Sequence, residues 1–485
     1  MGTVYAKEPS KSQNLGSSLG GRKPNLGDKD TYYNGGSNLS AEPGTPQKAV
    51  RNLGDIKTRV DKVHVDGLVR TKDDVVKSQL KELFKAHNFD DLILQTYNVR
   101  RRLESLGCFK NINVFIDASQ GPNSTPEGVE VTFTVRELRR IRGSINTAVG
   151  NNEGSVTLST EAPNIFGRGE RLTAEYSYGT KNSNHINISA IKPFFDSRHQ
   201  KVLTTSIFRT SSDFPWSGYK LSNKGFLVNL AVNQGKRSKI MHNFQYEADI
   251  RNVTASKQAA FQVREQCGPT LKSAMRHIFS IDKRDATLFP SKGSLIEITT
   301  ELAGLGGNIG FLKNELNLQT NWTVFDDLTF QLGFQSGFLR GISNDLKINI
   351  VDQFFLGGPL SLRGFEMRGL GPRSDGSSLG GDIFWAAALH LYTPLPFRPS
   401  FAAFIKLHGF INAGNLNNLS DMKTGNDYDE YLKIFTHNVR CSMGCGIAMI
   451  LGNMARVELN VIMPILFARS DALTQFQFGI GVKYL

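Results

Sequence analysis

From Arg139 to Leu485 the sequence alternates between polar and apolar residues, strand after strand, and this pattern limits the possible folds more than any other feature. Between Leu328 and Gln335, for example, Leu, Phe, Leu and Phe alternate with Thr, Gln, Gly and Gln. A period of two residues is that of a β-strand whose two faces meet different surroundings. No amphipathic helix of several turns interrupts the region, which argues against an α/β enzyme.

Two β architectures fit such a pattern. A soluble β-sandwich turns its apolar face inward, whereas a transmembrane β-barrel turns its apolar face to lipid and lines its lumen with polar residues. The length of the region separates them, because residues 139–485 are too many for one sandwich. At ~9–11 residues per spanning strand plus turns, they suit a barrel with strands in the mid-teens. A mean hydropathy of -0.27, with no apolar run of helix-spanning length, is compatible with such a barrel.

Two further parts precede the barrel region. Residues 1–53 are polar, lack the apolar core of a secretory signal, and are predicted to form a disordered tail. Residues 54–138 contain, in order, a strand, two helices and two strands, which predicts a small α+β domain. In that domain Thr71-Lys72-Asp73-Asp74 is typical of a helix capping box with Asp in place of Glu, and Gly107 is typical of a helix C-cap.

The stretch from Phe354 to Phe365 breaks the strand pattern. It contains a Gly-Gly-Pro break and then an arginine between apolar residues, and glycines continue to Asp382. A buried arginine needs an anionic partner. We therefore predict that residues 356–381 form a loop folded into the interior, with its charge bound to a wall. An ordinary surface loop between strands is the alternative interpretation.

Several motifs resemble one family. Leu362, Arg363, Gly364 and Phe365 match the [Ile/Val/Leu]-Arg-Gly-[Phe/Tyr] motif of the outer-membrane protein-assembly superfamily, which includes BamA and its two-partner-secretion and chloroplast relatives. The order of elements in residues 54–138 resembles a POTRA domain. Further stretches resemble turns and late strands of the superfamily, namely 164–170, 282–293, 391–396 and 412–415. A single POTRA domain and a polar N-terminus are most similar to the mitochondrial members, the core barrel of the sorting and assembly machinery (SAM).

The resemblance implies a function. It implies a barrel of sixteen strands in the mitochondrial outer membrane that inserts and assembles β-barrel precursor proteins, with the POTRA domain on the intermembrane-space side. The implied partners are these precursors, metaxin-type SAM subunits, the inner-membrane organising complex MICOS and membrane lipids. The residues themselves form no cofactor-binding or metal-binding motif, so we expect neither a cofactor nor a metal.

The two ends of the barrel region predict a gate. The first strand carries one face made of Ile141, Gly143, Ile145, Thr147 and Val149. The last residues include Gln477, Gly479, Val482 and Tyr484, which resemble the mitochondrial β-signal and are also the final strand of the barrel. A spanning sheet must pair its backbone groups, and an opened edge can pair with another chain. We therefore hypothesise a lateral gate between first and last strands, where a precursor's β-signal pairs with the first strand.

In this interpretation Arg363 holds the loop to the inner wall. The first candidate for its anionic partner is Asp382, at the start of the next strand, and Glu366 and Glu458 come second. Two wall positions that are acidic in bacterial relatives correspond here to His390 and Asn412, so the bacterial network does not transfer directly.

Other functions are weighed against the insertase. The sequence contains no catalytic motif and no zinc-type cysteine spacing, so we predict that it is not an enzyme. The net charge of +13 admits nucleic acid, but the basic residues are scattered and no nucleic-acid motif accompanies them. A passive outer-membrane pore would not explain the POTRA-like domain or the internal loop. A protein-translocating channel of the secretion or import type is expected to carry a signal or transit peptide and more than one POTRA domain.

Overall fold

The computed structural model describes most of the chain, in two compact units that divide between Leu138 and Arg139. The short turn 166–169 groups with the first unit. The described residues are 3–7, 56–122, 124–150, 153–181, 183–195, 199–234, 239–325, 328–396, 401, 404–419, 436, 438–452 and 455–485.

The first unit is a four-stranded sheet with two helices. The strands follow the order β1-β2-β4-β3, in which β1 and β4 run parallel to β2 and β3 runs antiparallel to β4. This arrangement confirms the predicted order of strand, helix, helix, strand and strand. The elements are β1 Thr3–Lys7, β2 Arg59–Asp66, α1 Asp73–Leu80, η2 Leu83–Lys85, α2 Phe89–Ser105, β3 Phe109–Ala118 and β4 Gly128–Glu137.

The core of this unit follows from the two periodicities. Alternate residues of β2 and β4, such as Val63 and Phe133, are fully buried. The helices bury residues at helical spacing, including Leu80, Leu92 and Val99. One expectation is corrected at the N-terminus, because Thr3–Lys7 form a strand on the edge of β2 and are not a disordered segment. The rest of the predicted tail lies outside the described residues.

A carboxylate at the end of β4 organises the start of α1. Glu137 accepts hydrogen bonds from the backbone N–H groups of Val69, Arg70 and Thr71 and from the Thr71 hydroxyl at 2.7 Å. The Thr71 hydroxyl is therefore not part of a capping box, and the N-cap position of α1 falls on Lys72 without a side-chain cap. The predicted capping box is wrong because the Thr71 hydroxyl donates to Glu137, which is distant in sequence, and does not cap α1.

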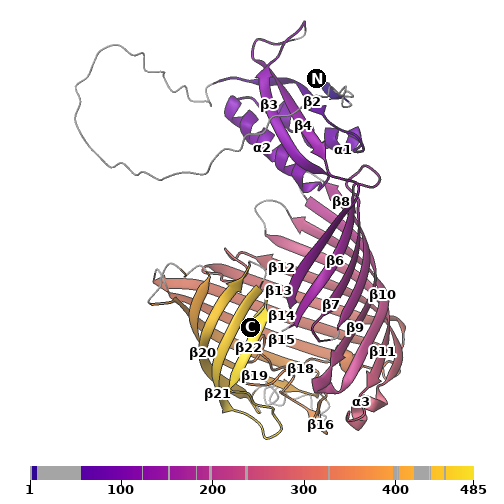
Figure 1. The fold of residues 1–485 in the computed structure, drawn as a ribbon, viewed down its shortest axis with the longest axis vertical. Coiled ribbons are helices and arrows are strands. Elements are labelled where there is room, and N and C mark those ends of the chain that lie inside the picture. Colours follow the sequence, from indigo (N-terminus) through magenta and orange to yellow (C-terminus); the bar gives the residue numbers. More distant parts are fainter. Residues whose placement is uncertain are drawn as a thin grey trace, which may run out of the picture. The chain divides into compact units, whose positions relative to one another are not determined.

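The second unit is one large antiparallel sheet of sixteen strands. Its strands are β5 Arg142–Gly150, β6 Glu153–Pro163, β7 Arg171–Gly179, β8 Asn184–Phe195, β9 His199–Phe214, β10 Tyr219–Gln234, β11 Ile240–Ala255, β12 Gly268–Asp282, β13 Gly293–Gly307, β14 Phe311–Phe325, β15 Leu328–Gly341, β18 Ile383–Pro394, β19 Ile405–Asn417, β20 Arg440–Leu451, β21 Ala455–Leu466 and β22 Phe476–Gly481. Each strand pairs with the next along the chain, from β5 to β22 (Figure 1).

Only short elements lie outside this sheet in the described part of the second unit. They are η3 Pro215–Ser217, α3 Phe261–Glu265, η4 Ile350–Asp352 and the two-residue strands β16 Arg373–Ser374 and β17 Ser377–Ser378. Among the described residues, no helix is both long and apolar enough to cross a membrane.

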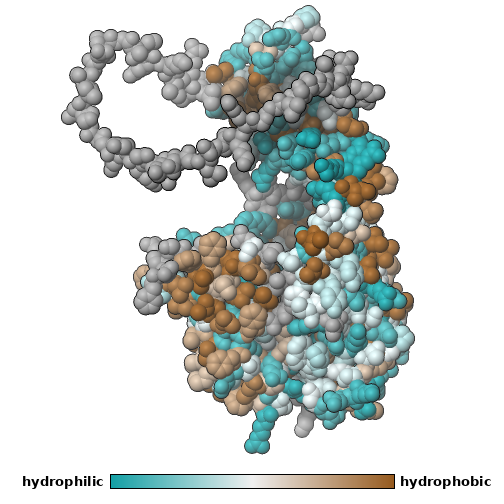
Figure 2. Space-filling view, viewed as in Figure 1, coloured by the Kyte–Doolittle hydropathy of each residue, from teal (hydrophilic) through white to brown (hydrophobic). Residues whose placement is uncertain are grey.

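The two faces of the sheet differ as predicted. Apolar side chains at alternate positions are exposed on the outer face, for example Ile145 at 74% and Tyr176 at 48%. Figure 2 shows such an apolar surface gathered over β20–β22. Polar residues occupy the inner face, and many of them are buried, including Glu301, His390 and Glu458. Apolar outside and polar inside is the pattern of a transmembrane β-barrel, and it excludes the sandwich.

The Glu137 contacts lead to a prediction about the first unit. The pKa of Glu137 lies below its ordinary value of 4.5: burial acts to raise it, and hydrogen bonds from Thr71, Val69 and Arg70 outweigh that effect. The charged form therefore stabilises the fold above pH 4.5, and this stabilisation is lost as the pH falls through the lowered pKa. Glu137→Gln should cost about 1–3 kcal/mol at neutral pH.

Hydrogen exchange of peptides covering residues 68–72, corrected for intrinsic exchange rates, measures this cost. The difference in protection between wild type and Glu137→Gln should shrink below pH 4.5, because only the wild-type side chain titrates. A difference that stays constant with pH would contradict the assignment.

Candidate functional site at the inner wall

The connection from β15 to β18 runs inside the barrel. Residues 342–382 form this connection, and its apolar side chains Leu356, Leu362, Phe365 and Leu370 are at most 1% exposed. They pack against wall residues such as Ala386 and Leu416 in one hydrophobic cluster. The loop is therefore a packed part of the interior, and the surface-loop alternative is wrong.

Arg363 forms a buried ion pair with Glu458 of β21. Its Nε donates to Glu458 Oε2 at 3.0 Å and its Nη2 donates to Oε1 at 3.3 Å. Both side chains are fully buried. Two parallel hydrogen bonds between a guanidinium and a carboxylate fix the relative orientation of the two groups as well as their distance. We call this ion pair the latch.

The first candidate for the partner of Arg363 is wrong. Asp382 Oδ2 accepts a hydrogen bond from the backbone N–H of Leu419 at 3.2 Å instead. Glu366 is exposed, and its backbone N–H donates to Ala472 O at 2.9 Å. Glu458 was a second-choice candidate, and the period of two residues along β21 places it on the inner face with Arg456 and Asn460.

Other groups surround the latch. Arg456 Nη2 lies 2.5 Å from Glu458 Oε1, and Asn460 Nδ2 donates to Oε2 at 3.0 Å. The Arg363 guanidinium also lies over the rings of Phe410 and Tyr484, at 5.2 and 5.4 Å from their centroids. Such ring contacts favour a desolvated cation. The carboxylate thus serves two arginines, and removing it would leave both buried charges without compensation.

His390 and Asn412, the two wall positions expected to depart from the bacterial pattern, also contact Arg363. His390 Nε2 lies 3.5 Å from Arg363 Nη1. Asn412 Nδ2 donates to the backbone oxygen of Arg363 at 3.2 Å, and the Ser442 hydroxyl donates to the same oxygen at 2.5 Å. Asn412 thus holds the backbone of the loop, His390 lies beside the guanidinium, and Glu458 pairs with the charge.

The loop is also bonded to the last strand and the turn before it. Gln477 of β22 donates through Nε2 to Phe365 O at 2.5 Å, and its Oε1 accepts from Gly364 N at 3.3 Å. Thr474 N donates to Gly364 O at 3.0 Å. Gly364 has a φ of +90°, and a Cβ there would lie 2.9 Å from Ile462, so only glycine fits this approach.

Glycines of β22 allow the loop to contact the strand closely. A Cβ on Gly479 would lie 2.7 Å from Pro359 Cβ, and a Cβ on Gly481 would lie 2.7 Å from Leu360 Cδ2. Gly479 thus has a packing role in this chain, alongside the expected role in a β-signal. Phe476 and Phe478 of the same strand are exposed at 75% and 54% on the outer face.

The residues after β22 leave the sheet and fold inward. Leu485 N donates to Leu360 O at 3.0 Å, and Leu485 O lies 2.8 Å from His390 Nε2. The Tyr484 hydroxyl donates to Arg456 O at 2.7 Å. Of the four predicted signal residues, Gln477, Gly479 and Tyr484 lie against the loop or the latch, and Val482 is 38% exposed.

The predicted gate strands are the two ends of the sheet. No backbone ladder joins β5 to β22 in the part of the chain that the structure describes, although their Cα atoms come within 8 Å. Of the predicted face, Gly143, Ile145 and Thr147 lie exposed on β5, Ile141 precedes the strand, and the Val149 side chain is outside the description. β22 has six residues, roughly 20 Å, which is less than the ~30 Å hydrocarbon core.

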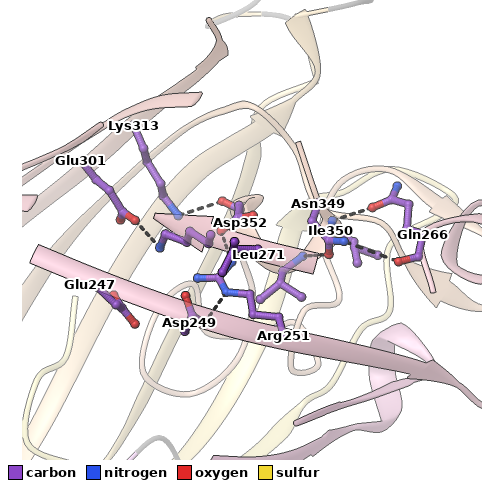
Figure 3. Close-up of polar contacts among 12 residues, drawn as sticks. Glu247, Asp249, Arg251, Gln266, Leu271, Glu301, Lys313, Asn349, Ile350 and Asp352 are labelled. Atoms are coloured by element: carbon purple, nitrogen blue, oxygen red, sulfur yellow. Dashed lines mark hydrogen bonds and ion pairs between the residues drawn. The ribbon is translucent and has the colours of Figure 1, made fainter. Parts of the chain in front are cut away.

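A second buried cluster binds the start of the loop, and the sequence did not point to it. Arg251 of β11 donates to Asp352 at 2.6 Å and to Asp249 at 2.7 Å (Figure 3). Lys313 of β14 donates to Asp352 O at 2.9 Å. Gln266 Oε1, beside α3, accepts from Ile350 N at 2.6 Å. The only available signal was the alternation of β11, which places Asp249 and Arg251 on the inner face.

The comparisons with known proteins agree with this geometry. A model of the Omp85 superfamily domain matches residues 164–484. The chain is 37% identical over 491 residues to the human Sorting and assembly machinery component 50 homolog, with 100% of each chain covered. It is 39% identical over 446 residues to homolog A of Xenopus laevis, covering 91% of this chain and 93% of that relative.

A solved structure shares the fold. BamA from Haemophilus ducreyi lacking POTRA domains 1–3 matches with a TM-score of 0.71 at 16% identity, covering 87% of this chain and 84% of that chain. The fold, the internal loop and the matched domain define this chain as a β-barrel of the Omp85 superfamily. Within that superfamily it belongs to the family of Sorting and assembly machinery component 50 homologues. The resemblance inferred from the motifs is confirmed.

The close contact between loop and last strand predicts the effect of one methyl group. Gly479→Ala should destabilise the second unit by about 1–3 kcal/mol, because the new Cβ overlaps Pro359. Gly409→Ala is the matched control, since a Cβ on that strand glycine meets nothing within 4 Å. Urea unfolding of the full chain in detergent micelles measures both, and equal losses in the two variants would contradict the packing role.

Proposed function

We propose that this chain inserts and assembles β-barrel precursor proteins into the mitochondrial outer membrane, through a lateral gate between β5 and β22. One observation carries the proposal. The two end strands of the sheet share no ladder in the described residues, and β22 is bonded to an internal loop instead. The similarity to Sorting and assembly machinery component 50 homologues over the whole chain supports it.

The exposed edge of β5 explains how a precursor would engage. β5 pairs with β6 over residues 142–150, and its other edge offers backbone N–H and C=O groups. Unpaired groups at an edge are a template for an extended chain. In lipid such a strand gains the hydrogen bonds that water cannot supply there. A precursor's terminal strand thus pairs with β5 in place of β22, and further hairpins add before the new barrel separates sideways.

The latch has a positioning role in this mechanism. It fixes Arg363 to β21, the neighbour of β22, and the adjoining residues Gly364 and Phe365 bond to Gln477. The loop therefore stabilises from inside a last strand that has no backbone ladder on its seam edge in the described residues. Glu458 and Gln477 hold the loop in place, and none of these residues is proposed to react chemically.

The two alternatives are less compatible with the structure. A passive pore requires an open lumen, whereas the loop fills the space beside β18–β22 and its apolar residues are buried there. A protein-translocating channel would also have to displace this packed loop. Conductance of reconstituted protein, recorded beside precursor insertion into the same liposomes, separates the pore from the insertase.

The location and partners belong to the same proposal. The proposed location is the mitochondrial outer membrane, with the POTRA-like first unit on the intermembrane-space side. There its sheet edge can bind an extended precursor segment by β-augmentation. Metaxin-type subunits and the MICOS complex are the proposed protein partners, by family resemblance, and the role is not enzymatic.

Site-specific crosslinking tests the gate. A photoreactive residue at Ile145 of β5 should crosslink to the terminal strand of a β-barrel precursor in liposomes containing the full chain. The same probe at Leu332, an exposed apolar residue in the middle of the sheet on β15, is the control. Adducts at Leu332 with none at Ile145 would exclude a gate at this seam.

Removing the latch should lower insertion. Arg363→Ala leaves Glu458 with Arg456 as its charged partner and removes the anchor of the loop, so precursor insertion should fall severalfold while the barrel still forms. The expected loss of stability is about 3–5 kcal/mol, as for other broken buried pairs. Arg340→Ala, an exposed arginine at the end of β15, is the control. A wild-type insertion rate in Arg363→Ala would refute the positioning role.

A further inference from the structure

Two cations lie directly opposite each other on neighbouring strands of the barrel. Arg209 of β9 and Lys224 of β10 are partners in the antiparallel register, and both are exposed. β9 and β10 are adjacent in the sheet (Figure 1). Like charges at directly opposite positions repel each other and destabilise the pair of strands. An anion bound between the two side chains would remove this repulsion.

Both side chains lie on the outer face of the barrel. Ile207 and Phe226, two residues away on the same face, are exposed at 68% and 43%. The preceding residue on β10, Asn223, stands opposite Arg251 of the internal cluster. Because side chains alternate between faces, Arg209 and Lys224 point away from the lumen.

The register places the pair at an edge of the apolar band. In the row on one side, Ile188, Ile207, Phe226 and Ala248 are apolar, and in the row on the other side, Asn184, Ser211, Ser222 and Asn252 are polar. Along β10 the outward residues from Phe226 to Val232 are all apolar, and Gln234 ends the run. From Lys224 to Gln234 the strand rises roughly 34 Å. Because barrel strands are tilted, this length corresponds to roughly 25 Å along the membrane normal, which is the height of a barrel's apolar band.

No acidic side chain compensates the pair. In the described part of the chain, neither Arg209 nor Lys224 takes part in an ion pair or a side-chain hydrogen bond. The acidic residue nearest along these strands on the outer face, Asp213, is four residues from Arg209, roughly 13 Å, and stands opposite Lys220. The pair therefore has no acidic neighbour to compensate it at this edge of the apolar band.

We propose that Arg209 and Lys224 form a binding site for the phosphate of an anionic phospholipid. A guanidinium binds phosphate oxygens through two parallel hydrogen bonds, and an ammonium adds a point charge beside it. Ile207 and Phe226 offer apolar surface to the acyl chains of the same lipid. The phosphate neutralises the cross-strand repulsion and so stabilises this part of the barrel. The site depends on the membrane-spanning sheet and not on the proposed insertase function.

Lipid retention tests the site directly. The full chain is reconstituted in nanodiscs of phosphatidylcholine with a minor fraction of phosphatidylglycerol, and bound lipid is measured by native mass spectrometry. Arg209→Gln/Lys224→Gln should retain phosphatidylglycerol at least about fivefold less than wild type. Lys220→Gln, four residues along the same strand beside Asp213, is the matched control and should retain wild-type levels. Equal retention in the double variant and wild type would overturn the proposal.

A charge reversal provides a second, independent test. Arg209→Glu replaces the like-charge pair with a Glu–Lys ion pair, so its thermal midpoint in pure phosphatidylcholine should exceed that of wild type. Added phosphatidylglycerol should raise the midpoint of wild type and leave that of Arg209→Glu unchanged. Inorganic phosphate should not replace the lipid. An equal shift in both proteins, or an equal shift of wild type with inorganic phosphate alone, would overturn the assignment to a phospholipid.

Discussion

The buried ion pair between Arg363 and Glu458 is the interaction on which the interior of the barrel depends. A lone buried charge is strongly unfavourable, so each partner requires the other to stay in place. Through this pair the loop between β15 and β18 is fixed to β21. Through the residues after Arg363 the same loop is bonded to β22. An internal segment thus supplies contacts for a last strand whose seam edge has no ladder in the described residues.

A second anchor makes the loop a brace across the lumen. Asp352, eleven positions before Arg363, is bound to Arg251 of β11, on a strand far from β21 in the sheet order. The loop therefore connects a wall strand from the middle of the sheet with the strands beside the seam. The loop is therefore bound at two points. A movement of the seam that displaces Arg363 is resisted at Asp352, which is bound to Arg251. Packing between the anchors transmits such strain because close-packed interiors are stiff.

Features that depend on local periodicity could be predicted from the sequence, and features that depend on long-range register could not. The strands, their two faces and the buried loop follow from alternation and from one arginine among apolar residues. The partner of Arg363 does not, since Asp382 is close in sequence whereas Glu458 becomes close only through the register of the late strands. Two other bonds also join residues that are distant in sequence. The Thr71 hydroxyl donates to Glu137 and so does not form the expected helix cap, and Arg251 donates to Asp352.

A double-mutant cycle on precursor insertion tests the central claim most directly. Insertion rates into liposomes are measured for Arg363→Met, for Glu458→Met and for the variant with both changes. If the two residues act only through the latch, the double variant should insert precursors no more slowly than the slower single variant. If the two losses multiply instead, the residues act independently, and the buried pair is not what couples the internal loop to the gate.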